Sequence, residues 1–203
     1  IRTLEGVMHI RMRPGMYIGR LGDGRNPNDG IYVLLKEIID NSIDEFSMGF
    51  GKAVNIKIED NRITIRDYGR GIPFGPSKDG GNTLDDAVSK LHTGAKFDNK
   101  NFQKSVGMNG VGLKAANALS SSFIVQSFRN GETLRLEYSK GKLLSRGFTV
   151  QPTTERNGTM VSFVPDDTPG IFEPYQYNME YVETMLRNYA YLNVGLKLNF
   201  NGQ

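Results

Sequence analysis

The residues with the clearest chemical capacity lie in one stretch, residues 37–45, inside a helical pattern that runs from about residue 29 to 48. Winding this segment at about 100° per residue places its aliphatic side chains on one face of the predicted helix. The opposite face carries carboxylates and an amide, and these polar residues are Glu37, Asn41, Asp44 and Glu45, with Asp40 at the edge.

Two interpretations of this polar face compete. A solvated face on an amphipathic helix is the simpler one. Solvated faces usually mix both signs of charge, because oppositely charged pairs at i, i+4 stabilise the helix. Here no Lys or Arg stands between Glu37 and Glu45, and such a cluster is stabilised by a bound cation or by an Arg from elsewhere in the chain. The composition of the face therefore favours a ligand site.

A further carboxylate, Asp67, closes a predicted strand and opens the segment Asp-Tyr-Gly-Arg-Gly-Ile-Pro at residues 67–73. Taken alone, Asp67 fits a turn-forming residue equally well. A third feature is the glycine-rich run 107–112, which precedes a helical pattern at 113–119. The free N–H groups and positive dipole of a helix N-terminus bind anions. The run lacks the Gly-Lys-Ser/Thr ending of a Walker A loop, so alone it is a weak signal.

Together the three features suit a nucleotide. Asn41 can hold a cation that bridges phosphates, Asp67 can accept a hydrogen bond from an exocyclic amino group, and the glycines at 110–112 can seat the phosphates.

Length and composition limit the class of protein. The chain has 203 residues, is 38% hydrophobic and carries a net charge of +3, which predicts one globular domain over residues 1–203. It has no Cys and two His, so disulfides and thiolate metal sites are excluded and a zinc site is disfavoured. We find neither a membrane-spanning run nor a signal-peptide pattern, and we expect a cytoplasmic protein with no membrane partner.

The periodicities predict the elements that position these residues. The predicted helices cover residues 4–12 with Thr3 as a cap, 29–48, 83–91 with Thr83 as a cap, 113–119 and 179–191. The predicted strands cover residues 53–59, 62–67, 123–128, 132–138, 142–149, 158–164 and 194–200, with a short extended piece at 16–19 and a polar loop at 93–106. Antiparallel strands after a mostly helical first half predict an α+β fold, a two-layer sandwich with one mostly antiparallel mixed sheet and helices on one face.

Four segments in this order resemble the ATPase domain of the B subunits of bacterial type IIA DNA topoisomerases. They are Glu-Ile-Ile-Asp-Asn-Ser-Ile-Asp-Glu (37–45), Asp-Tyr-Gly-Arg-Gly-Ile-Pro (67–73), Gly-Met-Asn-Gly-Val-Gly (107–112) and Asn-Gly-Thr-Met-Val-Ser-Phe (157–163). The family comprises the B-type polypeptide of DNA gyrase and the ParE polypeptide of topoisomerase IV, within the GHKL (Bergerat-fold) superfamily. Segments 13–19, 91–97 and 117–120 match it too, so the resemblance covers nearly the whole chain. MutL, the heat-shock chaperones and histidine kinases share the first motifs but lack the 13–19 stretch.

The resemblance implies binding and hydrolysis of ATP with Mg²⁺, and it assigns roles. Glu37 would be the general base that activates the attacking water, and Asn41 would carry the Mg²⁺ that bridges the phosphates. Asp67 would read the adenine amino group, directly and through water, with Thr159 supporting that network.

The remaining assignments concern the walls of the pocket. Glu45 and Arg70 would pair beside the adenine, with Arg129 at the mouth of the pocket. The adenine pocket would be lined by Ile38, Gly71, Ile72, Pro73 and Met108. The triphosphate would be wrapped by Gly107, Asn109, Gly110, Val111 and Gly112, with Lys96 on the lid.

The chain departs from the commoner family pattern within the predicted lid. The family has Tyr in place of Phe102, Gly in place of Val106 and Leu-His in place of Met108-Asn109, which puts the corresponding contacts in doubt. Gln103 replaces a Lys, which favours topoisomerase IV over gyrase.

The resemblance also implies partners: ATP or inhibitors of the adenine pocket, DNA, and the A-type subunit (GyrA or ParC). The full-length polypeptide would form a homodimer on binding ATP. The chain starts just short of the family's N-terminal arm and stops before its transducer domain, so we expect a fragment that is a monomer.

Two rival functions remain at this stage. In a non-hydrolytic clamp, ATP would only join two subunits, and such a module needs the Mg²⁺ ligand and the adenine-reading carboxylate but no base at position 37. A histidine-kinase catalytic domain is disfavoured by Glu37, because phosphotransfer to a protein His needs no water-activating carboxylate there.

Overall fold

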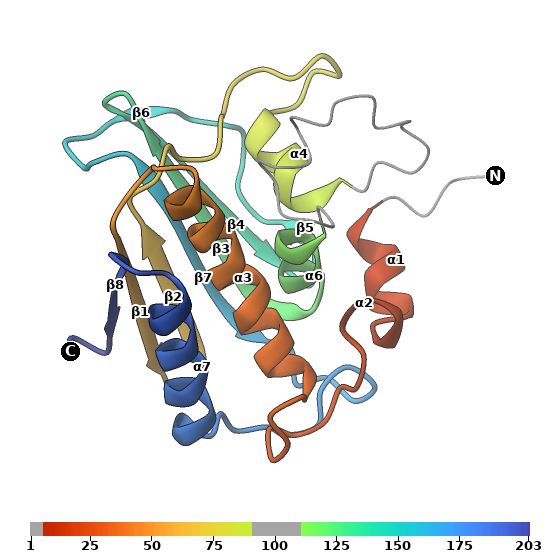
Figure 1. Ribbon diagram of the computed structural model, residues 1–203. Helices are drawn as coiled ribbons and strands as arrows, with labels where there is room; N and C mark the ends of the chain where they lie inside the picture. Colours follow the sequence, from red (N-terminus) through yellow and green to blue (C-terminus); the bar gives the residue numbers. More distant parts are fainter. Residues whose placement is uncertain (1–5, 91–110) are drawn as a thin grey trace.

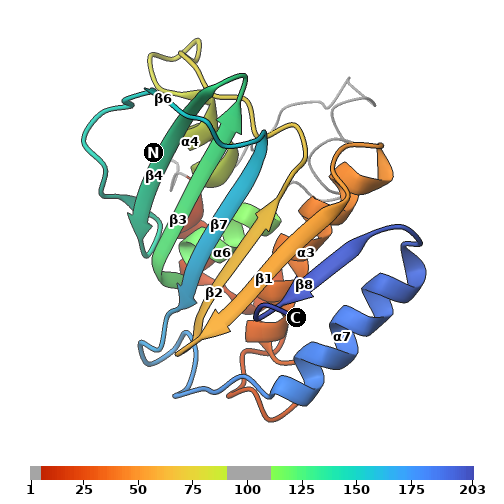
Figure 2. The ribbon, with the colours of Figure 1, turned by 90° about the vertical axis from the view of Figure 1, so that its left-hand side faces the viewer.

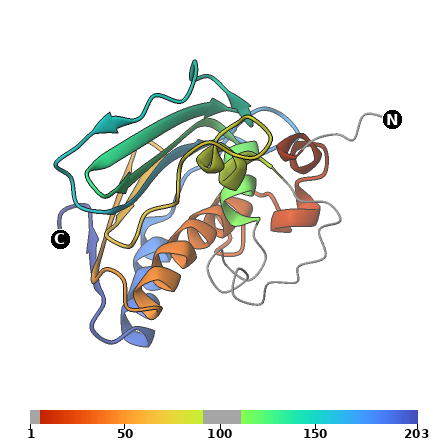
Figure 3. The same ribbon diagram turned by 90° about the horizontal axis from the view of Figure 1, so that it is seen from above.

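The computed structural model describes residues 6–90 and 111–203. Within them the chain forms two layers, a sheet and a set of helices against one of its faces (Figures 1 and 3). The N-terminal start of the first predicted helix and the predicted lid loop at 93–106 lie outside the described residues.

The sheet has the strand order β5-β4-β3-β7-β2-β1-β8, and β6 pairs with β4. Its strands are β1 (Ala53–Glu59), β2 (Arg62–Asp67), β3 (Ser120–Arg129), β4 (Glu132–Ser139), β5 (Lys142–Leu143), β6 (Gln151–Pro152), β7 (Gly158–Pro165) and β8 (Lys197–Phe200). All these pairs are antiparallel except β1 with β8, which is parallel. The predicted α+β fold with a mostly antiparallel mixed sheet is confirmed.

The helices of the described residues share one side of the sheet, and Figure 2 shows the opposite face without them. They are α1 (Val7–Met12), α2 (Gly15–Ile18), α3 (Gly30–Ser47), α4 (Thr83–Ser89), α6 (Gly112–Ala118) and α7 (Met179–Leu192). None of these described helices combines the length and the apolar character that crossing a bilayer requires.

The core lies between the two layers and follows the two periodicities of the sequence. On β1 and β2, alternate residues are buried, as a strand with one covered face requires. On α3 the buried aliphatic residues recur at helical spacing, and they are Ile31, Leu34, Leu35, Ile38, Ile39 and Ile43. Burial of each such side chain contributes about 1.5–3 kcal/mol, so this apolar stripe fixes the rotation of α3 and with it the orientation of its acidic face.

The β1–β2 hairpin sets the position of Asp67. Its two-residue turn, Asp60-Asn61, has φ values of 49° and 64°, and a turn with two positive φ angles matches the twist of the strands that it joins. The predicted hairpin is therefore confirmed, and β2 ends at Asp67 on the buried side of the sheet.

The extended piece predicted at residues 16–19 is wrong, because the chain forms the short helix α2 there. Pro14 stands directly before it with φ −61°. Proline has a fixed φ close to the helical value and no N–H to leave unpaired, so it starts a helix well.

The cap predicted at Thr83 is also wrong. Asn82 is the N-cap of α4, and its Oδ1 accepts a hydrogen bond from the Leu84 N–H at 3.0 Å. The Thr83 hydroxyl instead donates to the carbonyl oxygen of Pro73 at 2.9 Å. The helix ends at Ser89, and this contact ties its start to the end of the 67–73 segment.

Two predicted strands are shorter than their apolar patterns indicated. The strand expected at 142–149 is reduced to Lys142–Leu143, and a positive φ of 75° at Gly147 lies within the irregular stretch that follows. The last strand begins at Lys197 because Gly195, with φ 91°, belongs to the turn after α7. The two-residue strand β6 was not predicted.

Candidate functional site

The acidic face of α3 is half-buried along its length, as the polar residues Glu37, Asn41, Asp44 and Glu45 show. It faces the N-terminus of α6 and the loop that follows β2. Burial first, and the neighbouring carboxylates next, raise the pKa of Asp44 above its ordinary value. The solvated-face interpretation therefore fails for this helix.

Glu37 lies directly against the first residue of α6. A Cβ added to Gly112 would stand 2.8 Å from Glu37 Oε2, closer than real Cβ contacts come. Burial and then the charge of Asp40 raise the pKa of Glu37. A carboxylate with a raised pKa accepts protons near neutral pH more readily than an ordinary one, which suits a general base.

Asp40 is turned towards α7 rather than towards Glu37. Its Oδ1 accepts a hydrogen bond of 2.5 Å from the Tyr189 hydroxyl. Burial and this contact raise the pKa of Tyr189, so the phenol stays protonated and donates. Tyr189 was missed by sequence reasoning, since only the packing of α7 beside α3 brings it to this helix.

Asp67 is buried, with 7% of its surface exposed, and three donors hold its carboxylate. Oδ1 accepts from the backbone N–H groups of Gly69 at 3.0 Å and Thr159 at 3.2 Å. Oδ2 accepts from the Ser42 hydroxyl at 3.0 Å. Burial raises the pKa of Asp67 despite these three bonds. A carboxylate offers about four acceptor sites, so Asp67 retains capacity for one more donor.

Ser42 is a second residue that sequence reasoning missed. It stands on α3 directly after Asn41, and its hydroxyl joins this helix to the end of β2. A Ser inside an apolar helical stripe carries no signal of its own, because its partner is 25 residues away in the sequence.

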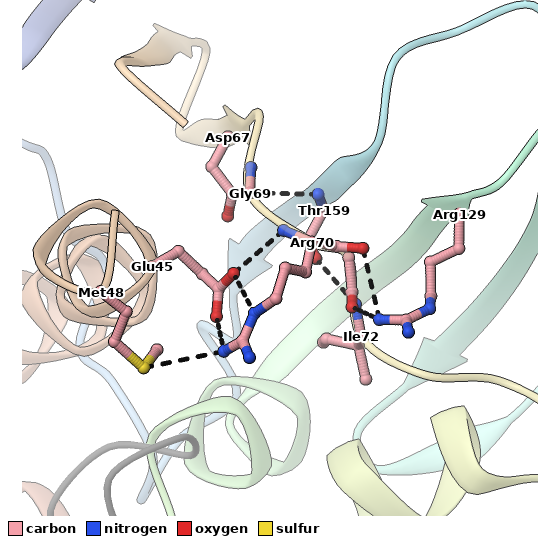
Figure 4. A network of polar contacts seen from close by, with 9 residues as sticks. Glu45, Met48, Asp67, Gly69, Arg70, Ile72, Arg129 and Thr159 are labelled. Atoms are coloured by element: carbon pink, nitrogen blue, oxygen red, sulfur yellow. Dashed lines mark hydrogen bonds and ion pairs between the residues drawn. The ribbon is translucent and has the colours of Figure 1, made fainter. Parts of the chain in front are cut away.

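Glu45 and Arg70 form the ion pair that the sequence predicts (Figure 4). Glu45 Oε1 accepts from Arg70 Nη2 at 2.8 Å, and Oε2 accepts from Nε at 3.1 Å and from the backbone N–H at 2.9 Å. Burial alone would raise the pKa of Glu45, and the hydrogen bonds from Arg70 overcome this and lower it. The guanidinium also lies 4.4 Å from the centre of the Phe50 ring.

The segment after Asp67 is held on two sides. Arg129 Nη1 donates to the carbonyl oxygens of Gly71 at 2.6 Å and Arg70 at 3.3 Å (Figure 4). The Ile72 N–H donates to Thr159 Oγ1 at 3.3 Å. Thr159 therefore contacts both Asp67 and Ile72, which places the predicted residues of β2, its loop and β7 in one cluster.

Glycine is required at two positions of this segment. A Cβ on Gly69 would stand 2.8 Å from Glu45 Oε2, and one on Gly71, whose φ is 77°, would stand 2.6 Å from the Phe128 carbonyl oxygen. Both glycines allow the loop to approach its neighbours more closely than any side chain would permit.

The other predicted residues fall into two groups. Ile38 is buried, Ile72 and Val111 are half-buried, and Pro73 is exposed beside the Thr83 contact. Val111 is the N-cap residue of α6. The predicted residues that lie outside the described part of the chain are Lys96, Gly107, Met108, Asn109 and Gly110.

The donor set of α3 fits a phosphate-bound cation. Within residues 6–90 and 111–203, no group of three or more His, Cys, Asp or Glu side chains is arranged to hold a metal. Mg²⁺ commonly uses one or two protein ligands and completes its shell with water and substrate phosphates. Asn41, one helical turn after Glu37 on the same face, offers one such ligand.

The sheet, the acidic helix and the carboxylate at the end of β2 together define an ATPase fold. Residues 26–169 match the family described as histidine kinase-, DNA gyrase B-, and HSP90-like ATPase, and the chain belongs to this family. The resemblance noted from the motifs is thereby confirmed.

Within the family, the chain is similar to the B-type polypeptides of topoisomerases. It is 52% identical to the one of DNA topoisomerase 4 from Borreliella burgdorferi, over 100% of this chain and 32% of that protein. It is 40% identical to the one of DNA gyrase from Enterococcus faecalis, over 98% of this chain and 30% of that protein. The chain thus spans about a third of the length of these relatives.

A solved structure supports the same relationship. The 43K ATPase domain of Thermus thermophilus gyrase B, crystallised with an aminocoumarin, superimposes with a TM-score of 0.80 at 33% identity. The match covers 98% of this chain and 49% of that one.

Proposed function

We propose that this chain is the ATP-binding and ATP-hydrolysing domain, over residues 1–203, of the B-type polypeptide of a bacterial type IIA topoisomerase. Family membership and the similarity to these B-type polypeptides support this proposal. In the full protein, hydrolysis would drive dimerisation and passage of one DNA duplex through another.

The adenine end would be read by Asp67. Its remaining acceptor capacity suits the exocyclic amino group of adenine, which is a donor, and Thr159 fixes the carboxylate from β7. The ion pair of Glu45 with Arg70 would border the base, with Arg129 at the mouth. The proposed walls are Ile38, Gly71, Ile72, Pro73 and Met108.

The phosphate end would lie between α3 and the start of α6. Asn41 would hold Mg²⁺, which supplies charge neutralisation for the phosphates when it is bound. The proposed phosphate contacts are Lys96, Gly107, Asn109, Gly110, Val111 and Gly112. Backbone N–H groups ahead of a helix favour anions there.

The observation that carries hydrolysis, rather than binding alone, is the contact between Glu37 and Gly112. It places a carboxylate with a raised pKa at the helix start where the terminal phosphate would sit. There Glu37 would take the proton from the attacking water. A clamp that only binds ATP has no need of this base, so steady-state ATPase rates of the full-length protein with Glu37→Gln separate the two functions.

Between the two enzymes we propose the topoisomerase IV type (ParE), since identity is 52% to the relative from a topoisomerase 4 and 40% to the relative from a gyrase. The partners would then be DNA and the A-type subunit (GyrA or ParC), in the cytoplasm where the bacterial chromosome lies. Decatenation without supercoiling by the full-length protein with its A-type subunit is the expected result. ATP-dependent negative supercoiling would instead identify gyrase.

A further inference from the structure

Arg66 lies on the face of the sheet that none of the described helices covers, with its guanidinium between two aromatic rings. It points away from the core, as its place next to the inward-facing Asp67 on β2 requires. The guanidinium carbon is 4.4 Å from the centre of the Tyr68 ring and 4.4 Å from that of Phe128. Only 13% of the side chain is exposed, although Arg66 is charged.

Two hydrogen bonds from Arg66 join the end of β2 to the segment that leads into β7. Nη1 donates to the carbonyl oxygen of Asp67, and Nη2 donates to that of Arg156 at 2.6 Å. The nearest carboxylate, that of Glu155, is 4.0 Å away and belongs to an exposed side chain. The charge is therefore satisfied chiefly by backbone carbonyls and aromatic faces.

Gly158 packs directly against this arrangement. Its φ is 147°, and a Cβ there would overlap both Arg66 Nη1 and the Asp67 carbonyl oxygen. The next residue is Thr159, whose N–H donates to Asp67 Oδ1. Arg66 thus contacts, on one side of the sheet, the backbone whose next N–H holds the Asp67 carboxylate on the other.

Arginine suits this position for a geometric reason. A planar guanidinium stacks on rings through its faces while its N–H groups donate in its plane. A lysine ammonium has no such plane, so it cannot stack between Tyr68 and Phe128 and also reach two carbonyl oxygens. Burying the charge costs free energy that only such contacts offset, and the proposed function gives Arg66 no part.

We infer that Arg66 is a positioning residue for recognition of the nucleotide base. It holds the Gly158-Thr159 backbone against the end of β2, so that the Thr159 N–H fixes the Asp67 carboxylate in the orientation that accepts from the base. Arg66 itself touches no nucleotide. This inference rests on the proposed function, because it gives Asp67 the role of base reader.

The test compares two substitutions on β2 in the full-length protein. Arg66→Gln removes the stacking and one of the two donors, and we expect the Kd for ATP to rise about tenfold while kcat changes less than about twofold, as for a loss of binding alone. Arg62→Gln is the control. Arg62 lies on the same face of β2 as Arg66 and donates to the hydroxyls of Ser122 and Ser162, away from Asp67, so ATP affinity should stay at the wild-type value.

Base discrimination provides a readout that a purely structural role would not change. GTP offers an acceptor where ATP offers the amino donor, so a well-oriented Asp67 disfavours it. Arg66→Gln should reduce the ratio of GTP Kd to ATP Kd, and Arg62→Gln should not. In an Asp67→Asn background, Arg66→Gln should add little, because the two residues act through one contact.

Each outcome is decisive. If Asp67→Asn leaves ATP affinity unchanged, the proposed base reader is wrong and the inference is lost with it. If Asp67→Asn weakens ATP while Arg66→Gln behaves like Arg62→Gln, the proposed function stands and the inference is overturned. Should Arg66→Gln fail to fold, Arg66→Lys keeps the charge and most of the apolar stem, and wild-type affinity and discrimination in that variant would overturn the inference.

Discussion

Gly112 at the start of α6 and Glu37 in the middle of α3 are in contact, and a Cβ on Gly112 would stand 2.8 Å from Glu37 Oε2. The two residues are far apart in the sequence, and both belong to motifs of the ATPase family. The contact makes the orientation of the proposed base dependent on the absence of a side chain at Gly112. Hydrolysis should therefore be sensitive to a single methyl group.

Gly112→Ala should lower kcat about 100-fold, because an enforced shift of the base by about 1 Å has a cost of that order. ATP affinity should fall much less, since the adenine contacts of Asp67 are on other elements. Single-turnover hydrolysis and calorimetric titration with a non-hydrolysable analogue measure the two effects. Gly75→Ala is the matched control, because a Cβ there meets nothing within 4 Å. Equal kcat for both variants would contradict the assignment.

Glu37→Ala should lower the rate of ATP hydrolysis by roughly 10²- to 10⁴-fold, which is the usual contribution of a general base. Nucleotide should still bind, since the proposed base contacts the water and not the adenine. The measurement is the steady-state ATPase rate of the full-length protein beside the Kd for ATP. Turnover at the wild-type rate would show that another group activates the water.

Asp67→Asn should weaken ATP binding more than it destabilises the fold. The amide presents a donor where the adenine amino group needs an acceptor, and a mismatched buried hydrogen bond costs roughly 1–3 kcal/mol. Calorimetric titration with ATP and with an aminocoumarin tests this. Unchanged affinity for both ligands would exclude Asp67 as the base reader.

The sequence predicted those features of the site that lie within one element or one motif. The helical period placed Glu37, Asn41 and Glu45 on one face of α3, and the alternation of β2 placed Asp67 on its covered side. The family motifs added Thr159 and the pairing of Glu45 with Arg70, and the structure has both contacts.

The missed residues depend on packing between elements far apart in the sequence. The Ser42 hydroxyl reaches Asp67 only because α3 lies across the end of β2, and Tyr189 reaches Asp40 only because α7 lies beside α3. Arg66 was read as one polar residue of an alternating strand, and its role needs β7 next to β2. The wrong cap at Thr83 has a local cause, since Asn82 and Thr83 are both good caps and their side chains compete.

The last prediction concerns the acid stability of the Glu45–Arg70 pair. Hydrogen bonds from Arg70 lower the pKa of Glu45 below its ordinary value of 4.5 in the folded protein. A lowered pKa means that the unfolded chain binds the proton more tightly. The pair therefore stabilises the fold above about pH 4.5, and this contribution is lost as the pH falls through the folded pKa.

Glu45→Gln should accordingly lower the free energy of unfolding at pH 7, by no more than about 1 kcal/mol because Arg70 is partly exposed. The difference from wild type should shrink steadily below pH 4.5, which urea titrations at a series of pH values would measure. Glu59→Gln is the control, since its pair with Lys57 is exposed on the outer face of the hairpin. A difference for Glu45→Gln that stays constant from pH 7 to pH 3 would mean that packing, and not the charge of the pair, holds α3 to the loop after β2.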